Sequence, residues 1–206
     1  MADLMPMVHA ERQSLADFLG TVSPEQWTTP TCCDMWNVQQ MVGHLVAAGN
    51  ITAGHFIPGF IGTGFNFNKF VDKDLQQYAK GTPDEVLTRF RTIITSTRKP
   101  PGPSYVALGE IVVHGEDIRR ALGSRGDHSP EHLVTLADLY RKAGAPLGAK
   151  KRLAGLRLQA TDVDWSTGEG PEVRGPAISL ILAMVGRAGA LDDCSGDGVE
   201  TLRARA

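Results

Sequence analysis

The chain has 206 residues, with 21 basic and 23 acidic side chains and a formal net charge of −2. This near balance gives no electrostatic reason to expect a nucleic-acid or anionic-membrane partner. A hydrophobic content of 42% with 21% charged residues is ordinary for a globular protein, and no apolar run approaches the roughly 20 residues of a membrane span. The length allows one large domain, or a main domain with a small one attached.

The N-terminus and the cysteines indicate a compartment. The opening residues MADLMPMVHAERQSL have no basic segment followed by an apolar one, so no signal peptide is predicted. Three cysteines cannot form a closed set of disulfides, and Cys32 and Cys33 are adjacent. We therefore expect a cytoplasmic protein with reduced cysteines, in which Cys32 and Cys33 have a structural role.

The first part of the chain is predicted to be helical. Apolar residues at helical spacing indicate a helix over residues 4–19. After the polar turn SPEQW, Trp36 is expected to anchor the entry of a second helix, for which Asn37 is the N-cap. Residues 54–68, GHFIPGFIGTGFNFN, are rich in glycine and phenylalanine and contain Pro58. A loop is predicted there, either lying over a pocket or forming an irregular hydrophobic crossover.

Three more helices are predicted after this segment. The first begins at TPDE, with Thr82 as N-cap and Pro83 at the first helical position. The segment KPPGP interrupts the pattern, and the next helix spans about residues 105–122, with Gly123 just past its end. Ser129 begins a further helix in SPEHLVTLADLYRKAGA.

The pattern changes after Gly144. GLRLQATDVDW alternates as a strand does, EGPEVRG is suited to pair with it, PAISLILAMVGR is a predicted buried helix, and GDGVETLRARA is a predicted final strand. We therefore predict a mainly α protein, with an up-and-down helical bundle in residues 1–145 and a small α/β domain in residues 146–206.

The helix GEIVVHGEDIRRALG carries Glu110 and His114 at positions i and i+4. Such positions lie about 40° apart around a helix axis, so both side chains reach one point. In a bundle, His44 on the second helix is placed to join them. Two imidazoles and a carboxylate suit Zn²⁺ with an open fourth position, and such sets also hold non-haem iron. The spacing alone equally fits an exposed pair or a buried hydrogen bond.

The segments TPTCCDMWNVQQMVGHL and EIVVHGEDIRRALG together resemble the maleylpyruvate isomerase family of mycothiol-dependent proteins, which belongs to the wider DinB-like metal-binding bundles. TDVDWSTGEGPEVRGPAISLILAMVGR and LDDCSGDGV resemble the family's small second domain. The resemblance implies a DinB-like four-helix-type bundle in which His44, Glu110 and His114 hold a divalent metal, usually zinc. It also implies mycothiol as cosubstrate and an actinobacterial source. Because the family includes isomerases, S-transferases and proteins of unknown activity, it does not name the reaction.

Two further residues are candidates for a role in catalysis. Asp117 is predicted either to orient a metal ligand or meet a substrate, or to form a salt bridge with Arg119 or Arg120. Arg187, at the end of an apolar helix, is predicted either to bind a substrate carboxylate with its planar fork or to act only as a favourable charge at the helix C-terminus.

The sequence thus predicts a metal-dependent enzyme that activates mycothiol as a thiolate for attack on a small-molecule electrophile, of the S-transferase or cis–trans isomerase type. One alternative is a hydrolase in which the metal activates water and Asp117 is the nearby base. Another is a non-catalytic metal or thiol sensor, with its fourth coordination position filled. No nucleic-acid or membrane partner is expected, and the chain is predicted to be a monomer or a homodimer.

Overall fold

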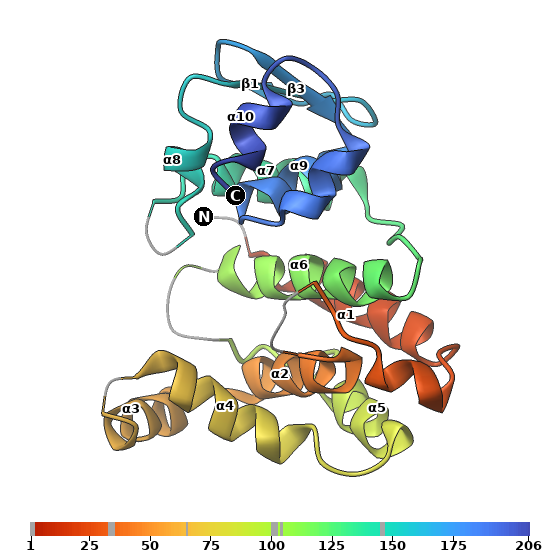
Figure 1. The fold of residues 1–206 in the computed structure, drawn as a ribbon. Helices are drawn as coiled ribbons and strands as arrows, with labels where there is room; N and C mark the ends of the chain where they lie inside the picture. The colour runs from red at the N-terminus through yellow and green to blue at the C-terminus, as the bar shows by residue number, and fades with distance from the viewer. Residues whose placement is uncertain (1–2, 33–35, 65, 100–102, 104, 145–146) are drawn as a thin grey trace. The chain divides into compact units, whose positions relative to one another are not determined.

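The computed structural model describes residues 3–32, 36–64, 66–99, 103, 105–144 and 147–206. The chain divides into two compact units, Met1–Gly126 and Asp127–Ala206, and is coloured by residue number in Figure 1. Within the described ranges, no helix is both long and apolar enough to cross a membrane.

The first unit is helical. Its elements are α1 (Met5–Leu19), the 3-10 helix η1 (Pro24–Thr28), α2 (Val38–Asn50), α3 (Ala53–Gly62), α4 (Phe67–Tyr78), α5 (Pro83–Thr92) and α6 (Tyr105–Ala121). Helices α1 and α2 each contact both α5 and α6, which makes a four-helix core, while α4 packs along α2 and α3 packs on α4 (Figure 1). The prediction of a mainly α fold with a helical bundle is confirmed.

The core of this bundle comes from the apolar stripes of all four helices. Fully buried side chains include Val8, Leu15, Val42, Val46, Phe90 and Val112. Burial of such stripes is the main favourable term in folding. The two predicted N-caps are also confirmed, because the Asn37 side chain accepts from the Gln40 N–H and the Thr82 side chain accepts from the Glu85 N–H. The start of α2 is therefore set by its own sequence.

The loop predicted for residues 54–68 is wrong, since this segment lies mostly in α3 and in the start of α4. Phe70 of α4 is buried, and its ring meets that of Phe56 edge-on at 5.3 Å. A Cβ added at Gly59 would come within 2.7 Å of the Phe70 ring, so glycine is needed for this approach. The packing of α3 on α4 thus outweighs the poor helix propensity of glycine and of Pro58 inside α3.

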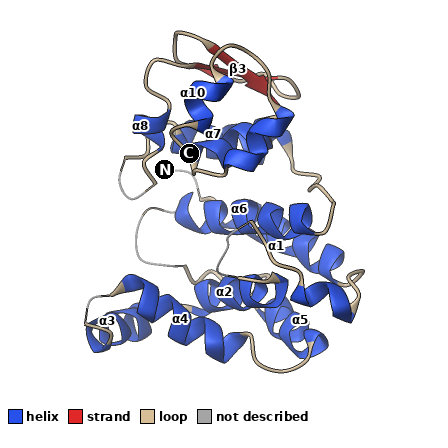
Figure 2. Cartoon of the chain, in the orientation of Figure 1, coloured by secondary structure: helices blue, strands red, loops and turns tan. Residues whose placement is uncertain are grey.

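The second unit combines helices with a small sheet. Its elements are α7 (Pro130–Tyr140), α8 (Ala149–Arg152), β1 (Arg157–Ala160), β2 (Ser166–Thr167), β3 (Glu172–Gly175), α9 (Ala177–Met184), the 3-10 helix η2 (Ala188–Asp193) and α10 (Val199–Arg203). The strand order is β2-β1-β3, with β1 antiparallel to β2 and parallel to β3. Figure 2 distinguishes these strands from the helices. The predicted pairing of the β1 and β3 segments is confirmed.

The strand predicted at the C-terminus is wrong, because this segment forms α10. Val199 and Leu202 are both buried, and their spacing is that of a helix rather than of a strand. The Gly198 N–H donates to the Glu172 carbonyl at the start of β3. The segment therefore packs beside the sheet without joining it as a strand.

The division between the units lies after Gly126, whereas the sequence predicted it near residue 145. Helix α7 packs against α9 of the second unit, and the Trp165 indole donates to Asp138 of α7 at 3.2 Å. The periodicity of an amphipathic helix shows which face is buried but not which core buries it. Periodicity alone therefore predicts the helix α7 but not the unit to which it belongs.

Candidate metal centre

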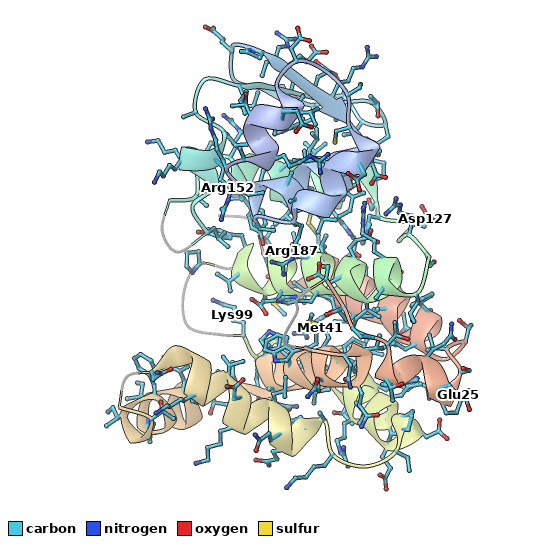
Figure 3. The ribbon with its side chains drawn as sticks, viewed as in Figure 1. Glu25, Met41, Lys99, Asp127, Arg152 and Arg187 are labelled. Atoms are coloured by element: carbon cyan, nitrogen blue, oxygen red, sulfur yellow. The ribbon has the colours of Figure 1, made fainter. Side chains whose placement is uncertain are left out.

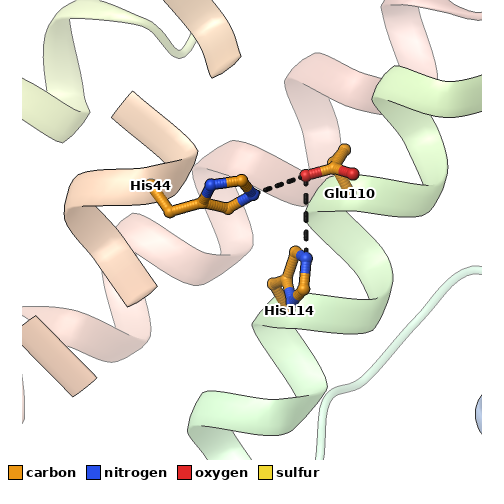
Figure 4. Close-up of side chains that lie close together, drawn as sticks. All are labelled: His44, Glu110 and His114. Carbon is orange, nitrogen blue, oxygen red and sulfur yellow. Dashed lines mark hydrogen bonds and ion pairs between the residues drawn. The ribbon is translucent and has the colours of Figure 1, made fainter. Parts of the chain in front are cut away.

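The three residues predicted as metal ligands lie together in the first unit. His44 extends from α2, and Glu110 and His114 extend from α6 (Figure 4). His44 Nε2 is 2.8 Å from Glu110 Oε2, and His114 Nε2 is 3.6 Å from the same oxygen. All three ligand atoms lie within 4.8 Å of one another. The structure therefore brings to one point two residues of one helix and a third that is distant in the sequence.

The packing of α2 explains why His44 faces α6. Its neighbours Gly43 and Leu45 are buried, and a Cβ added at Gly43 would come 2.7 Å from the Ala79 Cβ. The close approach of Ala79, the C-cap of α4, to Gly43 fixes the rotation of α2 about its axis. In this rotation the next side chain, His44, reaches Glu110 across the interface of α2 with α6.

The cluster is partly buried, and an aromatic ring packs against it. The side chains of both histidines are 14% exposed, and that of Glu110 is 29% exposed. The Trp36 ring lies 4.8 Å from the His44 ring at an interplanar angle of 30°, and 6.3 Å from the His114 ring. The sequence favours an anchor at the helix entry over a ring that stacks on a ligand, and in the structure Trp36 packs on both imidazoles. In the sequence, only the position of Trp36 directly before the N-cap Asn37 indicates that its ring could lie near α2.

Asp117 contacts Nδ1 of His114, the ring nitrogen that is not part of the cluster. Its side chain is 1% exposed, and its Oδ2 lies 3.1 Å from His114 Nδ1. Its Oδ1 accepts a hydrogen bond from the Cys32 thiol at 2.9 Å. With Asp117 ionised, its carboxylate can only accept from His114 Nδ1, and a neutral His114 then has its lone pair on Nε2, which faces the cluster. The geometry is that of an aspartate orienting a ligand.

The other candidates are two cysteines and an arginine. Cys32, whose thiol donates to Asp117, is exposed as a residue, and Cys33 lies outside the described residues. Arg187, labelled in Figure 3, belongs to the second unit and follows α9, where its backbone N–H donates to the Leu182 carbonyl at 3.0 Å. Its contact with a substrate stays a prediction.

The donor set fits a divalent metal. Bonds of 2.0–2.1 Å in tetrahedral geometry place neighbouring ligand atoms about 3.3 Å apart, and the two measured separations from Glu110 Oε2 fall on either side of that value. Among the residues that the structure describes, the group contains no fourth histidine, cysteine or carboxylate. Three protein ligands with a free fourth position are typical of catalytic rather than structural zinc sites.

Comparisons with known proteins agree with this architecture. Residues 8–102 match the family model described as the mycothiol maleylpyruvate isomerase N-terminal domain, a range that includes His44 and ends before α6. No curated protein matches the sequence significantly.

Two solved structures named as mycothiol-dependent maleylpyruvate isomerase, one of them a histidine-to-alanine mutant, have the same fold. Their TM-scores are 0.65 and 0.64 at 12% sequence identity, and each match covers 94% of this chain and 91% of that chain. At this identity the likeness concerns the fold, while the family model concerns the sequence of the first unit. The sequence of the first unit is thus similar to the N-terminal domain of the mycothiol maleylpyruvate isomerase family.

Proposed function

We propose that the protein is an enzyme that holds a divalent metal, most suitably Zn²⁺, on His44, Glu110 and His114, and uses it to activate mycothiol for attack on an electrophilic small molecule. The observation that carries the proposal is the convergence of three ligand atoms within 4.8 Å, with no fourth ligand from the described residues. The family description and the names of the matched structures, which specify mycothiol, support the identity of the thiol.

Each residue of the site has a separate task in this proposal. A divalent metal bound there would favour the thiolate form of a coordinating thiol near neutral pH. Asp117 keeps the proton of His114 on Nδ1 and so keeps Nε2 available as a ligand. Trp36 covers the His44 ring and keeps water from that side of the cluster. No side chain of the protein has to act as the nucleophile, because the thiol supplies it.

The same arrangement serves two related reactions. In both, the thiolate sulfur forms a bond to an electrophilic carbon of the substrate. If the substrate rotates about the resulting single bond and the thiolate is then eliminated, the product is the cis–trans isomer. If a leaving group departs instead, or if the adduct is protonated, the product is a thioether.

A hydrolase is the weaker candidate on the present geometry. Asp117 is the residue that the sequence offered as a base, and its buried carboxylate is engaged by His114 and by the Cys32 thiol. It is placed to orient a ligand rather than to remove a proton from water. This favours activation of a thiol over activation of water.

We further propose that Arg187 binds a carboxylate of the substrate. Arg187→Ala is then expected to lower the turnover of electrophiles that carry a carboxylate, because the planar guanidinium pairs with carboxylates in two places. Metal content should be unchanged. Steady-state rates of the wild type and of Arg187→Ala, each with a carboxylated electrophile and with its methyl ester, test this. If the two proteins turn over each substrate at the same rate, Arg187 has a structural role only.

Cobalt substitution tests the main proposal. Mycothiol added to the cobalt-loaded protein should produce a sulfur-to-metal charge-transfer band that strengthens as the pH rises through the pKa of the thiol, since thiolate is the species that binds. The His44→Ala protein should lack the band. Metal content well below one per chain after zinc loading would contradict the site. An unchanged spectrum together with hydrolysis of a test ester would favour the hydrolase.

A further inference from the structure

Two short segments at the entry of α2, residues 29–32 and 36–38, are hydrogen-bonded to each other. The Thr31 N–H and hydroxyl both donate to the Trp36 carbonyl, at 3.0 and 2.7 Å, and the pairing continues toward α2. These bonds fix the backbone next to two side chains that lie at the metal centre. One is Trp36, which packs on both imidazoles, and the other is Cys32, which directly follows the tied Thr31.

The Cys32 thiol contacts the same carboxylate that contacts His114. It donates to Asp117 Oδ1 at 2.9 Å, while the other oxygen, Oδ2, lies 3.1 Å from His114 Nδ1. Asp117 is 1% exposed, and a buried carboxylate is stable only where hydrogen-bond donors reach it. The thiol and the imidazole therefore each satisfy one oxygen of a single buried group.

The bond from the thiol restricts the torsion that aims Asp117 at His114. Rotation of an aspartate carboxylate about its Cβ–Cγ bond has broad minima, so the side chain alone does not fix the carboxylate plane. With Oδ1 held by Cys32, Oδ2 is directed at His114 Nδ1. The orientation of the imidazole, and with it the direction of Nε2, follows from that contact.

The exposure of Cys32 separates this contact from a packing role. Cys32 is exposed, so it adds little to the hydrophobic core. A thiol is also a weak donor, so its bond contributes little to the stability of the whole fold. Its effect falls on the buried carboxylate that it touches, and through that carboxylate on a proposed metal ligand.

We propose that Cys32 is a positioning residue of the metal centre, which acts through Asp117 on His114. The inference rests on the proposed function, because it concerns a metal held by His44, Glu110 and His114. It gives the thiol of Cys32 a role beyond the structural one predicted from the sequence, and it extends the site to the segment that precedes α2.

Cobalt affinities of the full-length protein and its variants test this role. Cys32→Ala removes the donor and should weaken cobalt binding about three- to tenfold, as expected for the loss of one hydrogen bond. Cys32→Ser keeps a donor and should return the affinity to within about twofold of the wild type. Cys194→Ala is the matched control, because that thiol belongs to the second unit and lies 3.9 Å from the Ala190 carbonyl. It should leave the affinity unchanged.

Proton NMR of the cobalt-loaded protein provides a readout that a merely structural role would not move. The proton on the outer nitrogen of a ligating imidazole gives a strongly shifted signal that exchanges with water. For His114, this exchange should be at least about threefold faster in Cys32→Ala and should return to the wild-type rate in Cys32→Ser. The His44 signal should be the same in all three proteins. Asp117→Asn identifies the His114 signal, because it changes the acceptor of that proton.

The outcomes separate this inference from the proposed function. Equal affinities and exchange rates in wild type and Cys32→Ala would overturn the role of Cys32 and leave the metal centre standing. Equal losses in Cys32→Ala and Cys32→Ser would also overturn it, because the hydrogen bond would not be the cause. If Cys32→Ala does not fold, as judged by circular dichroism, Cys32→Val replaces it under the same criteria.

The response to mycothiol completes the separation. Weaker cobalt binding by Cys32→Ala with rescue by Cys32→Ser, in a protein that gives no mycothiol band, would refute thiol activation and support the positioning role. A wild-type protein that binds no cobalt would overturn both.

Discussion

Helix α6 carries two groups of ionisable side chains, and the groups differ in how far they are buried and in what they contact. Near its C-terminal end, Glu116 is fully buried and accepts a hydrogen bond from Arg120 Nε at 3.2 Å. Arg119 is also buried and donates to Ser14 of α1. Burial lowers the pKa of Arg119, and the charges of Glu116 and Glu11 oppose that shift. Acidic and basic groups of the protein therefore balance one another here.

Earlier in α6, the side chains converge without this balance. Glu110 and His114 meet His44, so that one carboxylate oxygen and two imidazole nitrogens face a common point. Paired charges within the protein serve the fold, whereas a carboxylate oxygen and two imidazole nitrogens that face one point make the metal site proposed above.

Removing a proposed metal ligand should have the largest effect, because it should change metal content without changing helix content. We expect His44→Ala, or the double change Glu110→Ala/His114→Ala, to lose nearly all metal, because fewer protein ligands remain than a catalytic zinc site uses. Helix content should be nearly unchanged. Metal analysis after gel filtration and far-ultraviolet circular dichroism measure both quantities. Full metal content in His44→Ala would place the metal elsewhere.

Glu116→Gln should lower stability and leave metal binding unchanged. It leaves Arg119 and Arg120 without their buried carboxylate, and breaking such a pair typically costs about 3–5 kcal/mol of stability. Denaturant unfolding should show this loss, while metal content per folded chain stays at the wild-type value. A stability loss below about 1 kcal/mol would mean that this group matters less to the fold than its burial indicates.

Asp117→Asn tests the link between a buried carboxylate and a metal ligand. The amide cannot hold the His114 Nδ1 proton as a carboxylate does, so metal affinity should fall about 10–100-fold, the usual effect of losing an outer hydrogen-bond partner. A competition assay with a chelating dye measures this. Asp138→Asn is the matched control, because Asp138 accepts from Arg141 and Trp165 in the second unit. Equal affinities in both variants would remove Asp117 from the site.

Trp36 should give the smallest effect. Trp36→Phe keeps an aromatic ring beside His44 and should change metal affinity by less than about threefold, whereas Trp36→Ala removes a contact worth roughly 0.5–1.5 kcal/mol and should weaken binding severalfold. Tryptophan fluorescence provides a second readout, since cobalt bound next to the indole should quench it. If Trp27→Phe, a change at a buried tryptophan of η1, removed the quenching instead, Trp36 would not be the neighbour of the metal.

Local features of this protein could be predicted from the sequence because they depend on neighbouring residues. The N-caps Asn37 and Thr82 act on backbone groups three residues away. The pair Glu110 and His114 lies on one face because helix geometry requires it. The second helix places His44 at the edge of an apolar stripe, and the resemblance of the surrounding motifs to a known family led to the fold and to the three residues together.

Tertiary structure alone decided the features that depend on packing between distant segments. Burial of Phe70 made α3 and α4 from a segment whose composition is typical of a loop. Packing on α9 assigned α7 to the second unit. The contacts of Asp117 with His114 and of Trp36 with both imidazoles required the chain to be folded. The physical reason is that hydrophobic periodicity specifies which face of an element is buried, whereas its partner is chosen by the complementarity of surfaces that only the folded chain brings together.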